Sequence, residues 1–377
     1  MLCGGSRVFG LEIMALTLAR GFHARGHQVF TVACTWSDGE FSRRLAAAKI
    51  PYELAPFGKI SKSLQPLAVR YTVDALRHVP QARRQLRAHL CSFAPDVLIV
   101  YNRDAALLAR PALPPGRTMF HVHEVPEASR WNARLYRRIG AATATIVAAS
   151  HHIADQLRGF GIPERKIAVV HNGLDLGRIP ERREGRLTGP VRMAIIGQIG
   201  AWKGHDDFLA ALKLLREEGL AFEAVIIGTG DEAYVTELRA RAEAYGLGGV
   251  IAWRGYLADQ ASVYSSLDIV VVPSRFPEPF GLTAAEAGAW GLPVVASRRG
   301  GLPEIVSDGE SGFLVDAECP EQLADRLGRL IRNPELRARF GAAGRQRAIT
   351  AFSAERMVAE IEALCVAINA GAQHAAS

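Results

Sequence analysis

Long apolar runs and cysteine are both scarce in this sequence, and each shortage narrows the classes of protein to consider. No stretch among the 377 residues approaches the roughly 18 consecutive apolar residues that a membrane-spanning helix needs. The five cysteines lie far apart and form no Cys-x-x-Cys pair, so neither a disulfide framework nor a zinc site is predicted. Free, scattered cysteines favour a protein of the reducing cytoplasm.

Length and composition favour two ordinary globular domains. A chain of 377 residues is too long for one compact core, and contents of 49% apolar and 22% charged residues argue against large-scale disorder. Up to residue 175 there are 23 Lys and Arg against 12 Asp and Glu, whereas the remainder holds 22 against 26. The basic first part fits contact with an anionic membrane surface or another anionic partner, and solvated arginines on helix faces explain it equally well.

Short apolar runs bounded by turn residues alternate with helical patterns along the chain, which predicts α/β domains. The strands expected in the first half are residues 28–34, 96–101, 118–122, 145–149 and 166–170. Those expected in the second half are residues 193–196, 224–227, 250–253, 269–272 and 293–296. A polar stretch at 178–190 predicts a linker, so we expect domains at 1–177 and 191–350 and a terminal helix within 351–377.

One stretch concentrates chemistry-bearing residues at a predicted sheet edge. Residues 268–306 read DIVVVPSRFPEPFGLTAAEAGAWGLPVVASRRGGLPEIV and predict strand, Pro-rich loop, helix, second strand and a Gly-Gly turn that starts another helix. Such a βαβα unit directs its loops and helix N-termini to the edge where open parallel sheets bind ligands. Glu278 lies in the loop, and Glu286 follows inside the helix.

The segment EPFGLTAAE resembles the E-x7-E signature of the large retaining glycosyltransferase family 4, and the following GGLPEIV resembles the donor-phosphate loop of that family. The order of strand, Pro-Phe-Gly and Gly-Gly-x-Pro-Glu makes the resemblance specific. It implies the GT-B architecture: two doubly wound Rossmann-like domains facing a central cleft, with the terminal helix packing back toward the first domain.

The resemblance also implies a function. A hexosyl group would move, with retention, from a nucleotide-diphosphate sugar to an acceptor hydroxyl in glycan, exopolysaccharide or glycolipid synthesis. The donor is then a substrate, and no separate cofactor, no metal and no nucleic acid are expected. The acceptor would be a glycan or a lipid-linked molecule, so we expect a cytoplasmic enzyme that works at the inner face of the membrane when its acceptor is lipid-linked.

Most of the donor site is expected in the second domain. Lys203 precedes a helix and would stabilise the diphosphate leaving group, because a cation and a helix N-terminus act on the same developing charge. Glu278 would face the transferred sugar or its phosphate, and Glu286 would hold two ribose hydroxyls, since a carboxylate accepts from both. The other expected donor contacts are Gly4, Gly5, Gln198, Gly228, Gly230, Tyr256, Phe280, Gly281, Leu282, Gly300 and Gly301.

Three of these positions have features of their own. Gln198 stands where many family members carry Arg, which removes one cation from the expected diphosphate site. The run around Gly228 and Gly230, AVIIGTG, nearly matches a dinucleotide fingerprint. No acidic residue follows at the distance that would hold a ribose, so we interpret it as a loop that admits the nucleotide and not as an NAD site.

In the first domain, His121 and His123 end a predicted strand on the same side and Glu124 follows them. The resemblance places His123 against the donor sugar near its anomeric centre, so His123, Lys203 and Glu278 are the expected catalytic residues. A metal held by the two histidines and Glu124 is the alternative, which the lack of an Asp-x-Asp pair disfavours. Arg-rich helical segments at 71–87 and 130–138 predict a docking surface for an anionic acceptor or membrane, or solvated helix faces.

Two other functions share these sequence features. A GT-B-type sugar-nucleotide epimerase would use the same nucleotide site and would add acid and base carboxylates in the first domain. A non-catalytic nucleotide- or carbohydrate-binding protein would keep the fold without transferring a sugar.

A last expectation concerns the first strand. Met1, Leu2 and Cys3 precede Gly4 and Gly5, whereas an ordinary strand has about five or six residues. We therefore expect most of a central strand of the first domain to be missing, and the working enzyme to begin upstream of Met1.

Overall fold

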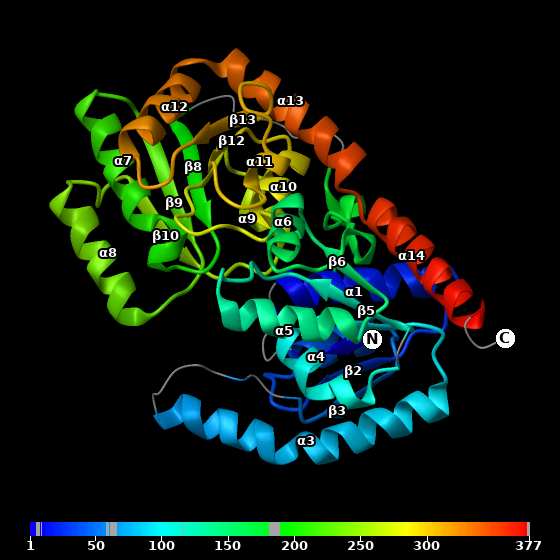
Figure 1. Cartoon of the computed structure of the whole chain (residues 1–377). Helices are drawn as coiled ribbons and strands as arrows, with labels where there is room; N and C mark the ends of the chain where they lie inside the picture. Colours follow the sequence, from blue (N-terminus) through cyan, green and yellow to red (C-terminus); the bar gives the residue numbers. More distant parts are fainter. Residues whose placement is uncertain are drawn as a thin grey trace. The chain divides into compact units, whose positions relative to one another are not determined.

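Two parallel sheets organise the chain, and each belongs to one of two compact units (Figure 1). Unit 1 comprises Met1–Gly173 and Ala354–Ser377, and unit 2 comprises Leu174–Ser353. The structure, a computed structural model, describes all residues except 5–7, 9, 58–59, 61–65, 115, 181–188 and 375–377, and also omits the side chains of residues 66–68 and 178. None of the described helices has the length and apolar content that crossing a bilayer requires.

Unit 1 contains a seven-stranded sheet in the order β3-β2-β1-β4-β5-β6-β7, with all neighbouring strands parallel. Its strands are β1 (Leu2–Cys3), β2 (Thr31–Cys34), β3 (Tyr52–Ala55), β4 (Leu98–Val100), β5 (Thr118–Val122), β6 (Thr145–Ala148) and β7 (Ile167–Val169). Its helices are α1 (Gly10–Ala24), α2 (Glu40–Ala47), α3 (Pro66–Phe93), α4 (Arg103–Ala109), α5 (Arg130–Ala141), α6 (His151–Gly159) and α14 (Ala354–His374), with short 3-10 helices η1 (Arg110–Ala112) and η2 (Glu164–Lys166).

Unit 2 repeats this topology with six parallel strands in the order β10-β9-β8-β11-β12-β13. Its strands are β8 (Val191–Ile196), β9 (Phe222–Ile227), β10 (Ile251–Gly255), β11 (Ile269–Val272), β12 (Val294–Ser297) and β13 (Gly312–Val315). Its helices are α7 (His205–Glu217), α8 (Glu232–Ala244), α9 (Gln260–Tyr264), α10 (Leu282–Ala289), α11 (Leu302–Ile305), α12 (Pro320–Arg332) and α13 (Pro334–Ala351), with 3-10 helices η3 (Leu176–Arg178) and η4 (Ala201–Lys203).

Buried, mostly apolar runs explain the strands that the sequence predicts best. The predicted strands 118–122 and 269–272 coincide with β5 and β11, and every residue of both is buried, as expected for parallel strands covered on two faces. The strands expected from residues 28 and 96 begin later, at Thr31 and Leu98. Besides β1, two of the described strands were not predicted: β3 exposes Glu53 and Leu54, and β13 is short and begins at a glycine.

Two residues hold the centre of the unit 1 sheet. Leu2 and Cys3 are buried and form β1, in which Leu2 pairs with Val32 of β2 and with Val100 of β4. The central strand that the sequence led us to expect as largely missing is therefore present as a two-residue strand, with a partner on either side.

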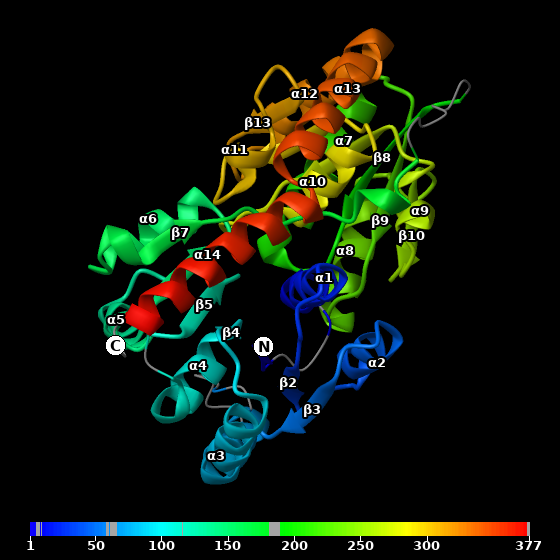
Figure 2. The same ribbon diagram turned by 90° about the vertical axis from the view of Figure 1, so that its right-hand side faces the viewer.

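The C-terminal helix α14 belongs to unit 1, where it packs along α1 (Figure 2). Glu362 of α14 receives hydrogen bonds of 2.5 Å from Arg25 and His27, which follow α1. Arg356 donates to the carbonyl oxygen of His171 at 2.6 Å, which ties α14 to the segment after β7.

Helices α10 and α13 of unit 2 pack through facing glycines. A Cβ on Gly341 would lie 2.1 Å from the carbonyl oxygen of Gly291, and a Cβ on Gly344 would lie 3.4 Å from the Cα of Gly288. The absence of side chains at these positions lets the two helix backbones approach, and α10 carries Glu286. The packing therefore helps to position a predicted site residue.

We expect Gly341→Ala to lower the free energy of unfolding by about 1–3 kcal/mol, because the added methyl group overpacks the contact with Gly291. The matched control is Gly371→Ala in α14, where a Cβ would meet nothing within 4 Å and Ala is the better helix former. Denaturant unfolding of both variants measures the difference. An unchanged midpoint for Gly341→Ala would show that α10 and α13 separate without cost.

Candidate active site

The carboxyl ends of β8 and β11 lie side by side where the winding of the unit 2 sheet reverses. The two strands pair in parallel, with Val271 opposite Ile195. In the order β10-β9-β8-β11-β12-β13, this pair forms the topological switch point, and open α/β sheets bind ligands in the crevice beyond it. The loops that follow β8 and β11 therefore define the candidate site of unit 2.

Lys203 and Glu278 come from these two loops and form an ion pair. The Nζ of Lys203 donates to Oε1 of Glu278 at 2.6 Å, and the Ser274 hydroxyl donates to the same oxygen at 2.6 Å. The Lys203 and Glu278 side chains are 27% and 14% exposed, so water and salt screen this pair less than a surface pair. The structure thus brings together two of the predicted catalytic residues, with Ser274 as a partner that the sequence analysis missed.

Glycines allow the backbones of these loops to meet. Gly204 has φ 76°, and a Cβ there would lie 1.9 Å from the carbonyl oxygen of Pro273. Gly300 has φ 59°, and a Cβ there would lie 2.2 Å from the carbonyl oxygen of Glu278, which also accepts from the Gly301 N–H at 2.8 Å. Any side chain at Gly204 or Gly300 would force the loops apart. Backbone contact therefore sets the positions of Lys203 and Glu278.

The predicted glycines after β9 join the same edge. The Ile199 N–H donates to the Thr229 carbonyl at 2.8 Å, and the Gly228 N–H donates to the Gly255 carbonyl at 2.7 Å. A Cβ on Gly230 would lie 2.2 Å from the carbonyl oxygen of Ile199. Close backbone packing thus accounts for both glycines, and it connects the loops that follow β8, β9 and β10.

Glu286 lies on α10 with both carboxylate oxygens engaged. The Tyr264 hydroxyl donates to Oε2 at 2.6 Å, and the Gln260 amide donates to Oε1 at 3.1 Å. Burial raises the pKa of Glu286, although these two hydrogen bonds act in the opposite direction. Each carboxylate oxygen keeps a second lone pair, so a ribose that binds here would share the carboxylate with Tyr264 and Gln260.

The remaining predicted contacts of unit 2 differ in accessibility. Gln198 is exposed, and the Tyr256 residue is 68% exposed directly after β10. Phe280 is only 2% exposed and packs edge-to-face on Phe352 with 5.5 Å between ring centroids. The side chain of Phe280 therefore belongs to the core, and a contact of this residue with the donor stays a prediction. Gly281, at φ 108°, precedes α10, and the half-buried Leu282 begins it.

In unit 1, His121 and His123 share one side of the end of β5, as the alternation predicted. Their ring centroids are 4.1 Å apart, and the Tyr101 ring lies 5.5 Å from His121 and 5.8 Å from His123. Within the described residues, both ring nitrogens of His121 lack a hydrogen-bond partner, and so does the Nε2 of His123. Burial lowers the pKa of His123 to about 3 and that of His121 well below its usual range, so both rings are neutral at pH 7.

Glu124, the third residue of the alternative metal cluster, forms polar contacts with other side chains. The Tyr136 hydroxyl donates to Oε1 of Glu124 at 2.6 Å, and the Arg103 Nε lies 3.6 Å from the same oxygen. Tyr136, which lies within the Arg-rich segment 130–138, is buried. Gly4 follows β1, and the predicted contact Gly5 lies outside the described residues.

An additional ion pair in unit 2 supports the loop after β11. Asp207, in the first turn of α7, accepts from Arg275 through both oxygens at 2.8 and 2.6 Å, and the Arg275 N–H donates to the Trp202 carbonyl at 2.9 Å. Ser274 and Arg275 follow the predicted strand 269–272, whose carboxyl end was expected to bind a ligand. Their position could therefore have identified both as candidate site residues. Nothing in the sequence spacing identifies Asp207, 68 positions earlier, as the partner of Arg275.

Two family models match adjacent parts of the chain. The model described as Glycosyltransferase Family 4 matches residues 8–178, and the model described as Glycosyl transferases group 1 matches residues 179–347. The chain belongs to glycosyltransferase family 4. The predicted family and the predicted GT-B pair of Rossmann-like domains are thereby confirmed.

Relatives of the chain include a D-inositol 3-phosphate glycosyltransferase of Corynebacterium jeikeium, with 35% identity over 217 residues. The match covers 53% of this chain and 52% of the relative, so the chain spans about half the length of that protein. Anabaena HepE, solved with UDP and glucose, has a TM-score of 0.80 at 20% identity, with coverage of 97% and 99%. Sucrose-phosphate synthase from Thermosynechococcus elongatus has a TM-score of 0.81 at 19% identity, with coverage of 98% and 99%. At identities this low, the similarity to these two structures shows a shared fold alone.

The family signature residue Glu286 should make stability depend on pH. Its pKa in the folded protein is above the ordinary value, so the folded state binds more protons than the unfolded state between the two pKa values. Its contribution to the free energy of unfolding therefore falls as pH rises through that window. Glu286→Gln, which does not titrate, should gain stability relative to the native sequence as pH rises above the ordinary pKa of a glutamate, about 4.3.

Urea unfolding at several pH values measures this relative gain. Glu335→Gln, at an exposed position in the first turn of α13, is the control for the substitution itself. Parallel pH curves for Glu286→Gln and the native sequence would contradict the assignment of a raised pKa to this carboxyl group.

Proposed function

We propose that the chain is a retaining, metal-independent hexosyltransferase that binds a UDP-sugar in unit 2 and transfers the sugar to a hydroxyl group of a phosphorylated polyol. The observation that carries the proposal is the group of Lys203, Glu278 and Ser274 at the switch point between β8 and β11. It combines a cation, a carboxylate and glycine backbone at the sheet edge where such folds hold a nucleotide.

Lys203 supplies the cation for the leaving diphosphate. When the bond between the sugar and the diphosphate breaks, negative charge grows on the phosphate oxygens, and a fixed ammonium group lowers the energy of that state. Before the donor binds, the ammonium group pairs with Glu278. The diphosphate therefore competes with Glu278 for Lys203, and binding frees the Glu278 carboxylate for a hydroxyl group of the sugar.

The remaining roles follow the family resemblance. Glu286 holds the ribose hydroxyls while Tyr264 and Gln260 fix its orientation. The neutral ring of His123 is suited to donate or accept one hydrogen bond to a ligand, because its pKa of about 3 keeps it uncharged at physiological pH. The acceptor hydroxyl attacks from the face that the diphosphate leaves and transfers its proton to a phosphate oxygen, so no covalent sugar–carboxylate intermediate is required.

The choice of UDP rests on the comparison with Anabaena HepE, whose structure contains UDP and glucose and resembles the whole of this chain. The choice of a phosphorylated polyol rests on relatives named D-inositol 3-phosphate glycosyltransferases. The net charge of +11 over residues 1–175, from 23 basic against 12 acidic residues, favours an anionic acceptor.

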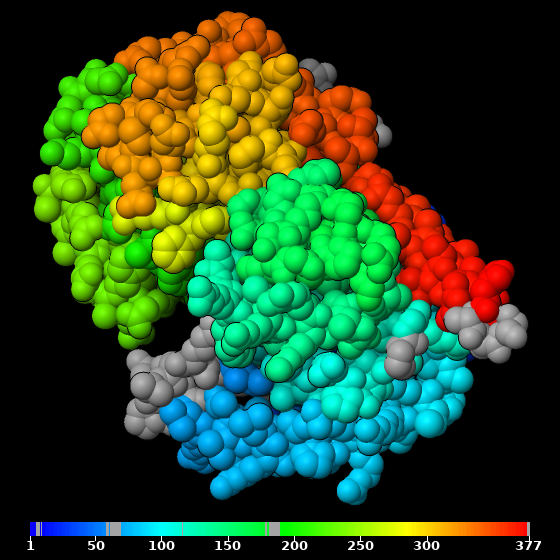
Figure 3. All heavy atoms as spheres, in the orientation of Figure 1, coloured from blue at the N-terminus to red at the C-terminus, as the bar shows by residue number. Residues whose placement is uncertain are grey.

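A lipid-linked molecule is the second candidate for the acceptor, and the surface of α3 is the feature that favours it. This helix forms one outer side of unit 1 (Figure 3). Its exposed residues include Val73 and Leu76 beside Arg77, Arg84 and Arg87. Apolar and cationic side chains on one helix suit the interface of an anionic bilayer.

The test is a donor and acceptor screen on the whole chain, with EDTA present. UDP should raise the melting temperature, and UDP-glucose or UDP-N-acetylglucosamine with D-inositol 3-phosphate should release UDP and give a product with the anomeric configuration of the donor.

Interconversion of the UDP-sugar without an acceptor would instead indicate an epimerase, and a thermal shift without turnover would indicate a binding protein. Transfer only to acceptors in anionic vesicles would select the lipid-linked class, and activity only after Mg²⁺ is restored would refute metal independence.

With a donor identified, we expect Lys203→Ala to lower kcat by roughly 10²–10³-fold, the usual cost of losing one electrostatic donor to a developing charge. The control is Lys213→Ala on α7, since that exposed lysine pairs with Glu217 four residues later and should leave kcat unchanged. Steady-state kinetics at saturating donor measures both. Normal turnover by Lys203→Ala would remove Lys203 from the diphosphate site.

A further inference from the structure

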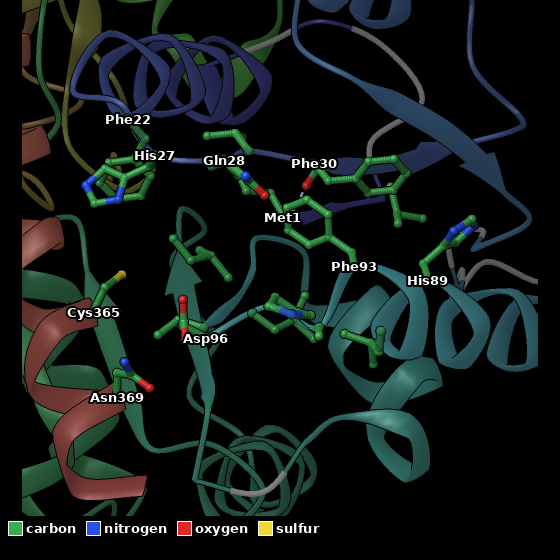
Figure 4. A pocket seen from close by; sticks show the side chains of 18 of the residues that line it. Met1, Phe22, His27, Gln28, Phe30, His89, Phe93, Asp96, Cys365 and Asn369 are labelled. Atoms are coloured by element: carbon green, nitrogen blue, oxygen red, sulfur yellow. Dashed lines mark hydrogen bonds between the residues drawn. The ribbon is translucent and has the colours of Figure 1, made fainter. Parts of the chain in front are cut away.

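Unit 1 contains a cavity of about 470 Å³, whose lining includes His27, Phe30 and Asp96 (Figure 4). These three residues precede β2 and β4 along the chain, so the cavity lies at the amino ends of the parallel strands. Open α/β sheets bind ligands at the opposite, carboxyl edge. Further contacts with a substrate of the proposed transfer are therefore expected at a carboxyl edge, and unit 2 shows a candidate there.

Exposed aromatic residues lie at the carboxyl edge of the unit 2 sheet. Among the described residues of this unit, the exposed large apolar ones are Trp202, Tyr256, Phe276 and Ile349. The three aromatic residues follow β8, β10 and β11 at their carboxyl ends, whereas Ile349 lies near the end of α13. Apolar side chains that are exposed beside a ligand edge are typical of a binding surface. Tyr256 is already a predicted donor contact, and the other two aromatic residues remain to be explained.

Trp202 lies directly before Lys203, and its indole ring packs on the backbone of Gly200. A Cβ on Gly200 would lie 2.4 Å from both Cζ3 and Cη2 of that ring. The backbone of Gly200 is extended, with φ −170°, a conformation that any residue adopts, so the missing side chain serves the contact with the indole. Trp202 nevertheless remains 40% exposed. One part of the residue is thus held by the chain, and another part is open to a ligand.

Phe276 lies beside Trp202 and is 68% exposed. The Trp202 carbonyl accepts from the N–H groups of Arg275 at 2.9 Å and of Phe276 at 3.4 Å, so the loops after β8 and β11 are in backbone contact. Lys203 follows Trp202, and Glu278 follows Phe276 after one intervening residue. Trp202 and Phe276, here called the aromatic pair, therefore lie within two positions of the Lys203–Glu278 ion pair.

The proposed reaction places the acceptor on the same side as the leaving diphosphate. In a retaining transfer without a covalent intermediate, the acceptor hydroxyl attacks from the face that the diphosphate leaves and gives its proton to a phosphate oxygen. That hydroxyl must therefore lie within hydrogen-bond reach of the phosphates, next to the Lys203 that binds them. The aromatic pair is the exposed apolar surface nearest to Lys203 along the two loops.

We propose, on the basis of the proposed function, that the aromatic pair binds the apolar face of a ring in the acceptor and thereby selects cyclic over open-chain polyols. A cyclic polyol carries its hydroxyl groups around the rim and C–H groups on its faces, so an aromatic ring can cover one face while the rim reacts. Removing this apolar surface from water contributes affinity, and aromatic side chains lose little conformational entropy on binding. An open-chain polyol has no fixed face and must first be ordered.

The experiment compares D-inositol 3-phosphate with the open-chain sorbitol 6-phosphate as acceptors for the full chain. We expect Trp202→Ala and Phe276→Ala each to raise KM for the cyclic acceptor about 10-fold, while KM for the UDP-sugar stays unchanged. KM for the open-chain acceptor should be high already in the native chain and should not rise further. Trp202→Phe, which keeps an aromatic ring, should restore most of the affinity. Ile349→Ala is the control at an exposed apolar position away from the sheet edge and should leave every constant unchanged.

A binding measurement separates this proposal from the transfer activity. Adding D-inositol 3-phosphate to the UDP-bound chain should change the tryptophan fluorescence, and Trp202→Phe should remove most of that change. A native chain that gives this response but transfers no sugar would refute the proposed function and support the ring contact.

Three results would overturn the ring contact. The first is a native chain without the fluorescence response. The second is an unchanged KM for D-inositol 3-phosphate in both alanine variants. The third is a loss of affinity confined to the UDP-sugar, because the aromatic pair would then hold the donor.

Discussion

Parallel pairing of β8 with β11 is the constraint on which the site of unit 2 depends. It places the two following loops at one edge of the sheet, and the chain then meets itself through backbone contacts at Gly204 and Gly300. A loop that is fixed by backbone contact has little freedom to relax, so the side chains that it carries are pre-positioned. Lys203 and Glu278 therefore occupy defined places before any ligand arrives, which reduces the reorganisation that binding requires.

The ion pair between these two residues has a function beyond stability. A partly buried pair gains Coulomb energy but loses hydration, and its net contribution to folding is small or of either sign. Its greater effect is to keep an ammonium group from turning toward solvent. Because Ser274 donates to the same carboxylate oxygen, Glu278 keeps a hydrogen-bond partner when Lys203 is attracted to another anion. The site can thus exchange one partner of Lys203 for another without leaving the carboxylate unpaired.

Sequence and structure agree where the signal is local. Strand β11 is a continuous apolar run and β5 is mostly apolar, and the E-x7-E spacing is measured along a single loop and helix, so all were predictable. Pairs such as Asp207 with Arg275 and Tyr264 with Glu286 were not predicted, since each depends on which strands become neighbours. Phe280 illustrates a different limit: its place in a family signature said nothing about the direction of its side chain, which turns into the core against Phe352.

The charges near the switch point determine which groups can neutralise a diphosphate. Gln198 brings no cation, and the guanidinium of Arg275 is held by both oxygens of Asp207, so its charge is already balanced. In the proposed site, Lys203 would supply one positive charge against the two or more negative charges of a nucleoside diphosphate. Groups without formal charge can contribute to the balance, such as backbone N–H groups in the glycine turn at Gly300 and the N-terminus of α10. Since dipoles of this kind cannot leave the site, the glycines are as necessary to the proposed chemistry as the lysine.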